Sequence, residues 1–166
     1  SLLVGPASSE TAPSPAWSAY VDGDLHSFDY ANAITTDAAG NVYVTGSADR
    51  DYVTVKYAPD GSLLWKARYD GPAHSTDNAV ALAVDLQGNV YGTGSSYGAT
   101  SGSGGTDYDI TTVKYDAWGQ ELWVDRYDGA GGEDVGKAIA IDSTGAAVVV
   151  GAAWGAVSAW DYVTLK

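Results

Sequence analysis

The chain has 166 residues, with 8 Lys and Arg against 21 Asp and Glu, so its formal net charge is −13 at pH 7. This acidity excludes a fold that grips nucleic-acid phosphates through a basic face. A hydrophobic content of 45% with 17% charged residues argues against global disorder, and no apolar run approaches the about 20 residues of a transmembrane helix.

The start of the chain differs in composition from the rest. Residues 1–15 are rich in Ser, Ala and Pro, and we expect a disordered linker or the remainder of a processed leader. The chain contains no Cys, which excludes disulfides, thiol catalysis and cysteine metal sites.

One pattern occurs three times without a gap, at 29–46, 77–94 and 134–151. Each copy continues into a segment of the type Asp-x-x-Thr-x-Lys. The first two copies then proceed to a turn, a Trp and the sequence Arg-Tyr-Asp-Gly. A repeat of this period indicates a solenoid or a propeller.

Each copy is typical of four short strands. In the first copy we expect a strand over 33–36, a turn at 37–40, and strands that alternate through 42–44 and 52–57. A second turn at 60–61 leads to a fourth strand that ends near Trp65. Four antiparallel strands in about 40–50 residues predict one blade of an all-β propeller.

The motif Asp-x-x-Gly-Asn-Val-Tyr-x-Thr-Gly, at 37–46 and 85–94, carries a resemblance to a known family. From Trp17 onward the chain resembles the bacterial SBBP-type β-propeller repeat family. The third copy departs from the motif, with Ala146 and Ala147 in place of the Asn-Val pair. The resemblance implies a propeller and no single activity, because such repeats occur in many large, mostly extracellular bacterial proteins.

The order of the strands predicts a permuted arrangement. Residues 16–23 read as an outer strand, followed by blade 1 at 29–71, blade 2 at 77–129, and blade 3 at 134–166 without its outer strand. Three blades do not close comfortably into a ring, since propellers run from about four to eight blades. We therefore expect a six-bladed homodimer, in which each N-terminal strand completes the third blade of the other copy. The alternative is a fragment of a longer propeller.

Three repeated carboxylates form a candidate metal site. Asp29, Asp77 and Asp134 lie just ahead of the innermost strand of each blade. A ring of such groups at the channel mouth would suit Ca²⁺ or another divalent cation. The alternative is that each carboxylate bonds backbone amides between neighbouring blades.

Two histidines stand three residues before two of these aspartates. His26 precedes Asp29, and His74 precedes Asp77. A His beside a carboxylate near a metal is the minimum for metal-assisted hydrolysis, loosely similar to propeller phosphotriesterases and lactonases. Two surface histidines inherited by duplication explain the pattern equally well.

The residues that break the repeat are candidates for ligand binding. They are extra aromatic residues, expected on loops and in one turn: Tyr97, Tyr108, Trp118, Trp154 and Trp160. Such residues suit sugar faces or another small-molecule ligand. The alternative is that they fill the dimer seam.

Three functions are compatible with these features. The first is a secreted or cell-surface module that binds a ligand or partner, with no nucleic-acid partner and no membrane insertion. The second is the metal-dependent hydrolase. The third is a structural piece of a longer surface protein.

Overall fold

The computed structural model describes residues 14–25, 28–98, 107–155 and 159–166. All regular structure in these residues is β, and no helix among them is long and apolar enough to cross a membrane. The strands are β1 (Tyr30–Thr36), β2 (Val42–Ala48), β3 (Asp51–Tyr57), β4 (Leu63–Tyr69), β5 (Asp77–Val84), β6 (Val90–Tyr97), β7 (Tyr108–Tyr115), β8 (Glu121–Tyr127), β9 (Val135–Ile141), β10 (Ala147–Trp154) and β11 (Trp160–Leu165).

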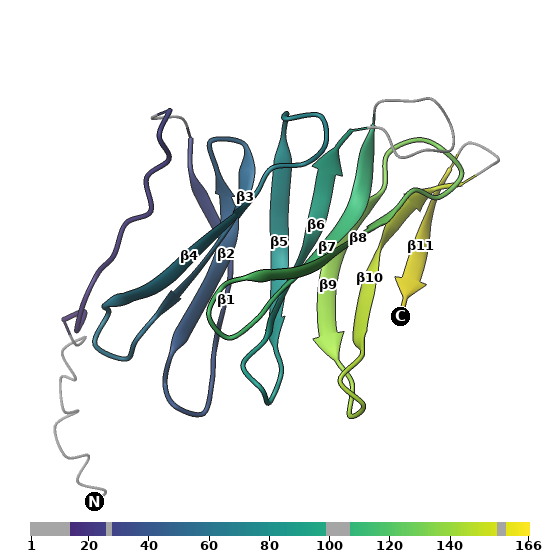
Figure 1. Ribbon diagram of the computed structural model, residues 1–166. Helices are drawn as coiled ribbons and strands as arrows, with labels where there is room; N and C mark the ends of the chain where they lie inside the picture. Colours follow the sequence, from purple (N-terminus) through teal and green to yellow (C-terminus); the bar gives the residue numbers. More distant parts are fainter. Residues whose placement is uncertain (1–13, 26–27, 99–106, 156–158) are drawn as a thin grey trace, which may run out of the picture.

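The strands form three antiparallel sheets that follow the three copies of the repeat. Their orders are β1-β2-β3-β4, β5-β6-β7-β8 and β9-β10-β11. The sheets stand side by side in chain order (Figure 1), with β5 packed against β1 and β2, and β9 packed against β5 and β6. The all-β prediction is confirmed, and the arrangement is consistent with propeller blades. We call the interface between the first two sheets the first seam, and the next one the second seam.

The turn between the first two strands explains the conserved spacing of Asp and Gly within each copy. Asp37 Oδ1 accepts hydrogen bonds from the amides of Ala39 and Asn41, both at 2.9 Å. Gly40 has a φ of 81°, a conformation that favours glycine. Asp85 and Asp142 accept the equivalent bonds in the other two copies. The turn aspartates are therefore structural, since each holds backbone amides of its own turn.

The fourth strand is longer than predicted. Strand β4 runs past Trp65 to Tyr69, because Arg68 and Tyr69 still pair with Val53 and Tyr52 of β3. The rings of Tyr52 and Tyr69 also pack edge to face, with centroids 5.6 Å apart. The prediction was wrong here, because it treated the Arg-Tyr pair as part of the closing turn.

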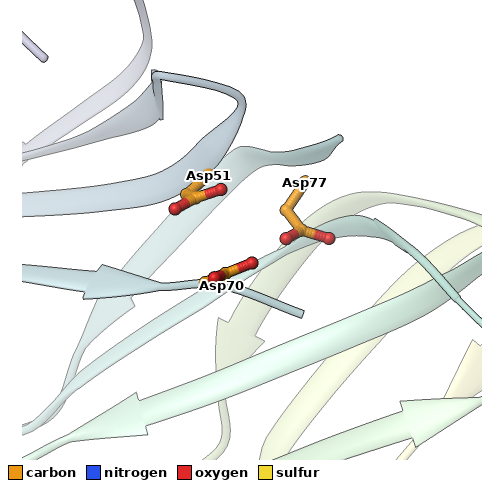
Figure 2. A group of neighbouring side chains, drawn as sticks. All are labelled: Asp51, Asp70 and Asp77. Atoms are coloured by element: carbon orange, nitrogen blue, oxygen red, sulfur yellow. The ribbon is translucent and has the colours of Figure 1, made fainter. Parts of the chain in front are cut away.

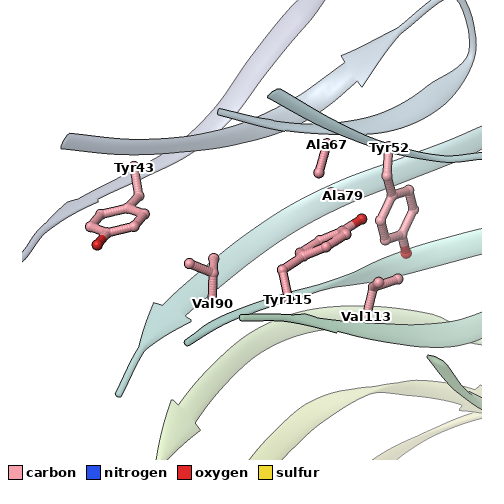
Figure 3. Close-up of a cluster of buried hydrophobic side chains, with 7 residues drawn as sticks. All are labelled: Tyr43, Tyr52, Ala67, Ala79, Val90, Val113 and Tyr115. Atoms are coloured by element: carbon pink, nitrogen blue, oxygen red, sulfur yellow. The ribbon is translucent and has the colours of Figure 1, made fainter. Parts of the chain in front are cut away.

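The larger of two core clusters lies in the first seam (Figure 3). Side chains from both sheets meet there: Tyr43, Tyr52, Ala67, Ala79, Val90, Val113 and Tyr115. Trp65, the repeated tryptophan, packs against this cluster. A second cluster lies on the other face of the first sheet, where Trp17 and Val21 of the N-terminal segment pack against buried residues of β2 and β3: Ala48, Val53, Val55 and Tyr57. Each sheet thus buries apolar side chains against a neighbouring element.

Candidate functional site

Each seam contains three aspartates whose side-chain oxygens lie within 4.8 Å of one another. The clusters are Asp51, Asp70 and Asp77 in the first seam (Figure 2), and Asp109, Asp128 and Asp134 at the equivalent positions of the second. Carboxylate oxygens are the preferred ligands of hard cations. Both clusters could therefore bind a metal ion.

Neither cluster is the predicted ring. Asp29, Asp77 and Asp134 do not group together among the described residues. Each instead accepts hydrogen bonds from two backbone amides, at 2.6–3.2 Å. The donors are Gly23 and Asp49, Gly71 and Tyr97, and Gly129 and Trp154. This is the bracing alternative, since these bonds hold the connection before each sheet against the end of the second strand of that sheet.

Sequence reasoning missed an arginine in each cluster. Arg68 pairs with Asp51, and Arg126 Nη2 lies 2.6 Å from Asp109 Oδ2. Both arginines begin the repeated Arg-Tyr-Asp-Gly sequence, and this recurrence was the available signal. In the structure Arg68 lies opposite Val53 and Arg126 opposite Thr111, each two residues after the Asp that the arginine reaches. Each guanidinium offsets part of the negative charge that burial of three carboxylates concentrates.

The second cluster differs from the first in its buried polar atoms without a hydrogen-bond partner among the described residues, which are Asp109 Oδ1, Asp128 Oδ1 and Arg126 Nε. Asp109 is 0% exposed, and its Oδ1 atom has no hydrogen-bond partner among the described residues. Burial raises the pKa of Asp109, with the Arg126 guanidinium opposing the shift. Burial also raises the pKa of Asp134. A buried carboxylate oxygen without a donor is costly, so Asp109 Oδ1 is the atom that a cation would satisfy.

Of the two predicted histidines, His74 lies in the described part of the chain. His26 lies outside the described residues. His74 has a side chain that is 79% exposed, and its Nδ1 atom lies 2.7 Å from Asp70 Oδ2. The hydrogen bond to Asp70 raises the pKa of His74. His74 thus lies beside the first cluster, at the solvent surface.

The extra aromatic residues lie at strand ends rather than in free loops. Tyr97 pairs with Tyr108 across the ends of β6 and β7, and Trp154 pairs with Trp160 across β10 and β11. The ring centroids are 5.1 and 5.8 Å apart. Trp154 also lies against Gly132 in the second seam, where a Cβ atom would meet its ring. Trp154 thus packs against residues of its own chain, and these contacts do not bear on the dimer seam; Trp118 is exposed in its turn.

The N-terminal segment occupies the place of a fourth strand from a preceding sheet. Trp17 Nε1 donates to Pro59 O at 3.2 Å, in the turn after β3. Trp65 Nε1 donates to Ala117 O at 3.1 Å, in the equivalent turn after β7. Residues 14–25 belong to no strand among the residues that the structure describes, and they run beside the first sheet (Figure 1). The segment is therefore docked like β4, without the sheet to which such a strand belongs.

Both ends of the three-sheet array expose apolar surface. A groove of about 550 Å³ lies between the N-terminal segment and the first sheet, lined by apolar residues such as Val21, Val42 and Val55. At the other end, Tyr162 of β11 is 89% exposed, whereas Tyr52, at the same repeat position, is 1% exposed in the first seam. The same repeat position is thus buried where a following sheet packs on it and exposed on the third sheet, which has no such sheet on this face in the described part of the chain.

Antiparallel sheets of four, four and three strands that pack in series are consistent with the blades of a β-propeller. The family model of the SBBP β-propeller repeat matches residues 17–52, and this stretch is a repeat of that family. The predicted resemblance is confirmed there. No curated protein matches the chain. The matched span begins at Trp17, so the lone N-terminal segment is part of the repeat and not a separate extension.

Proposed function

We propose that the chain is a binding module that works outside the cell, built as a closed six-bladed propeller from two copies. A β-propeller repeat fold suggests a binding or structural module, and the hollow ends of a closed propeller offer a rigid surface for a ligand or partner. The acidic composition supports a soluble extracellular role and disfavours anionic partners.

The contrast between Tyr52 and Tyr162 carries this proposal. A second copy that places its first sheet on the β9–β11 sheet would bury Tyr162 as the first seam buries Tyr52. The same contact would fill the groove beside Val42 and Val55. Two copies of three sheets make six blades, within the range of about four to eight for closed propellers. Two identical end-to-end contacts then close the ring by two-fold symmetry.

The mass of the particle in solution tests the assembly. Light scattering should give twice the 17.1 kDa of one chain. Tyr162→Asp should lower the mass to one chain, because it places a charge in the centre of the new seam. Leu86→Asp is the matched control, since Leu86 is equally exposed in a turn away from both ends. A wild-type mass of one chain would refute the assembly.

A cation in the second seam is the second candidate, and the free Oδ1 atom of Asp109 supports it. We propose Ca²⁺ at Asp109, Asp128 and Asp134, because oxygen-only ligands suit this ion. Arg126 already faces the other oxygen of Asp109, so the ion would complete the coordination of the carboxylate. The role would be structural, since the cluster lies between two sheets.

Thermal unfolding after chelator treatment tests the cation. An ion that binds only the folded chain stabilises it by about 2.7 kcal/mol when the ion is present at about 100 times its dissociation constant, and a melting curve resolves this difference. Asp109→Asn should abolish the rise in melting temperature. Asp51→Asn should keep it, because the first cluster has no buried oxygen without a partner among the described residues. An unchanged melting temperature for the wild type would exclude the site.

A further inference from the structure

We propose that residues 17–23 of a second copy add to the free edge of β11 in one defined register, with Thr164 opposite Ala19 and Val163 opposite Tyr20. This inference rests on the proposed two-copy assembly. It adds the pairing of the strands and the residues of the closing seam, which is the proposed interface between the β9–β11 sheet of one copy and the first sheet of the other.

Two sheets of the chain supply the register independently. In the first sheet Thr54 of β3 lies opposite Ala67 of β4. In the second sheet Thr112 of β7 lies opposite Asp125 of β8, which is the same pair of repeat positions. Thr164 occupies that position in the third strand of its sheet, and Ala19 follows Trp17 by the same two residues that separate Ala67 from Trp65.

Both partners of this pairing are already in place. Among the described strands β11 pairs with β10 alone, so its other edge has no described partner strand. The N-terminal segment is held on its own first sheet by the bond from Trp17 to Pro59 O. An edge strand and an extended unpaired segment join through main-chain hydrogen bonds. The segment needs no rearrangement, since β4 contacts the second sheet through Trp65 in the same way.

The closing seam differs from the internal seams at one position. Tyr20 stands where Arg68 and Arg126 stand in β4 and β8, and it is 93% exposed in the single chain. In the proposed register Tyr20 lies opposite Val163 and diagonally across from Asp161, the counterpart of Asp109. Arg126 likewise lies opposite Thr111 and reaches Asp109. The hydroxyl of Tyr20 then replaces the guanidinium as the donor. Ala153 occupies the repeat position of Ser96, whose hydroxyl oxygen accepts a hydrogen bond from Arg126 in the second sheet. The closing seam is therefore less polar than the second seam, as a contact between two copies requires.

Introduced thiols test the register, because the natural chain contains no Cys. Chains with Thr164→Cys are mixed with chains with Ala19→Cys under oxidised glutathione, so a mixed disulfide can form only between two copies. The matched control replaces Ala19→Cys by Ser18→Cys. Opposite residues of paired strands have Cβ atoms close enough for a disulfide, and a shift of one residue turns the side chain to the other face. The yield of mixed disulfide should be roughly tenfold higher with Ala19→Cys than with Ser18→Cys.

The outcomes separate this inference from the assembly on which it rests. Equal yields from the two mixtures, or no disulfide in either, with a wild-type mass of two chains, would overturn the register and leave the assembly intact. A wild-type mass of one chain would overturn both. Tyr20→Arg provides a second reading, since it restores the arginine of the internal seams opposite Asp161. It should tighten the two-copy particle by roughly tenfold, as a charge-assisted pair replaces a neutral donor, and an unchanged dissociation constant would contradict the assigned place of Tyr20.

Discussion

Replacement of Gly94 by Ala is expected to destabilise the chain by about 3 kcal/mol or more, at the upper end of the cost of overpacking. A Cβ atom at this position would lie well inside contact distance of the carbonyl oxygen of Asn78, on the paired strand β5. Strand β5 has a register shift between Ala79 and Ala81 that brings this carbonyl close. Urea unfolding measured by tryptophan fluorescence would give the loss.

Gly92→Ala is the matched control, two residues earlier in the same strand. Its Cβ atom would meet the hydroxyl oxygens of Thr45 and Thr54 at 3.8 Å, which is ordinary contact. We expect a change within about 1 kcal/mol, and a gain is reasonable because glycine weakens a strand. Similar losses for Gly92→Ala and Gly94→Ala would contradict the role assigned to the bulge.

The same geometry explains a residue that the sequence motif left unexplained. Gly46, Gly94 and Gly151 end the three copies of the motif, and in each a Cβ atom would meet a carbonyl of the first strand. That strand has a register shift in every sheet. Repetition of a glycine was visible in the sequence. The reason for it was not, because a bulge on another strand leaves no local pattern.

The strands and turns were predictable because each copy repeats the same alternation and the same Asp and Gly positions. The candidate site was only partly predictable. Asp77 and Asp134 were recognised by their recurrence, but their neighbours in the clusters come from the preceding sheet, at Asp51 and Asp109. Alignment of the copies shows which residues occupy equivalent positions, but it does not show which positions of one sheet contact which positions of the next. The arginines were missed for this reason.

The docked N-terminal segment, unlike the arginines, was predictable from the sequence. The spacing of Trp17 from Asp29 matched that of Trp65 from Asp77, and this alone indicated a fourth strand separated from its sheet. The structure adds the hydrogen bond of Trp17 and the open groove beside it. The spacing of Trp17 from Asp29 thus predicted the structure better than the differences between loops did. The aromatic residues expected on loops lie in paired strand ends instead.

Asp77→Ala should cost about 2–4 kcal/mol, because it leaves one buried and one partly buried backbone amide without an acceptor, and a buried amide alone costs about 1–3 kcal/mol. These amides belong to Gly71 and Tyr97, and the Asp77 side chain that they reach is 0% exposed. Part of this loss is offset, since the substitution also removes one of three clustered carboxylates, the others being Asp51 and Asp70. The net loss is still large against the about 5–15 kcal/mol that stabilises a typical domain.

Asp60→Ala separates this effect from the general loss of an aspartate. Asp60 also accepts a backbone amide, from Ser62 at 2.9 Å, but in an exposed turn where water can replace the acceptor. We expect a loss of about 1 kcal/mol or less. Chemical unfolding of both variants at neutral pH compares the two directly. Equal losses would show that the carboxylate of Asp77 does not brace the first seam, and the amides that it holds would then need another partner.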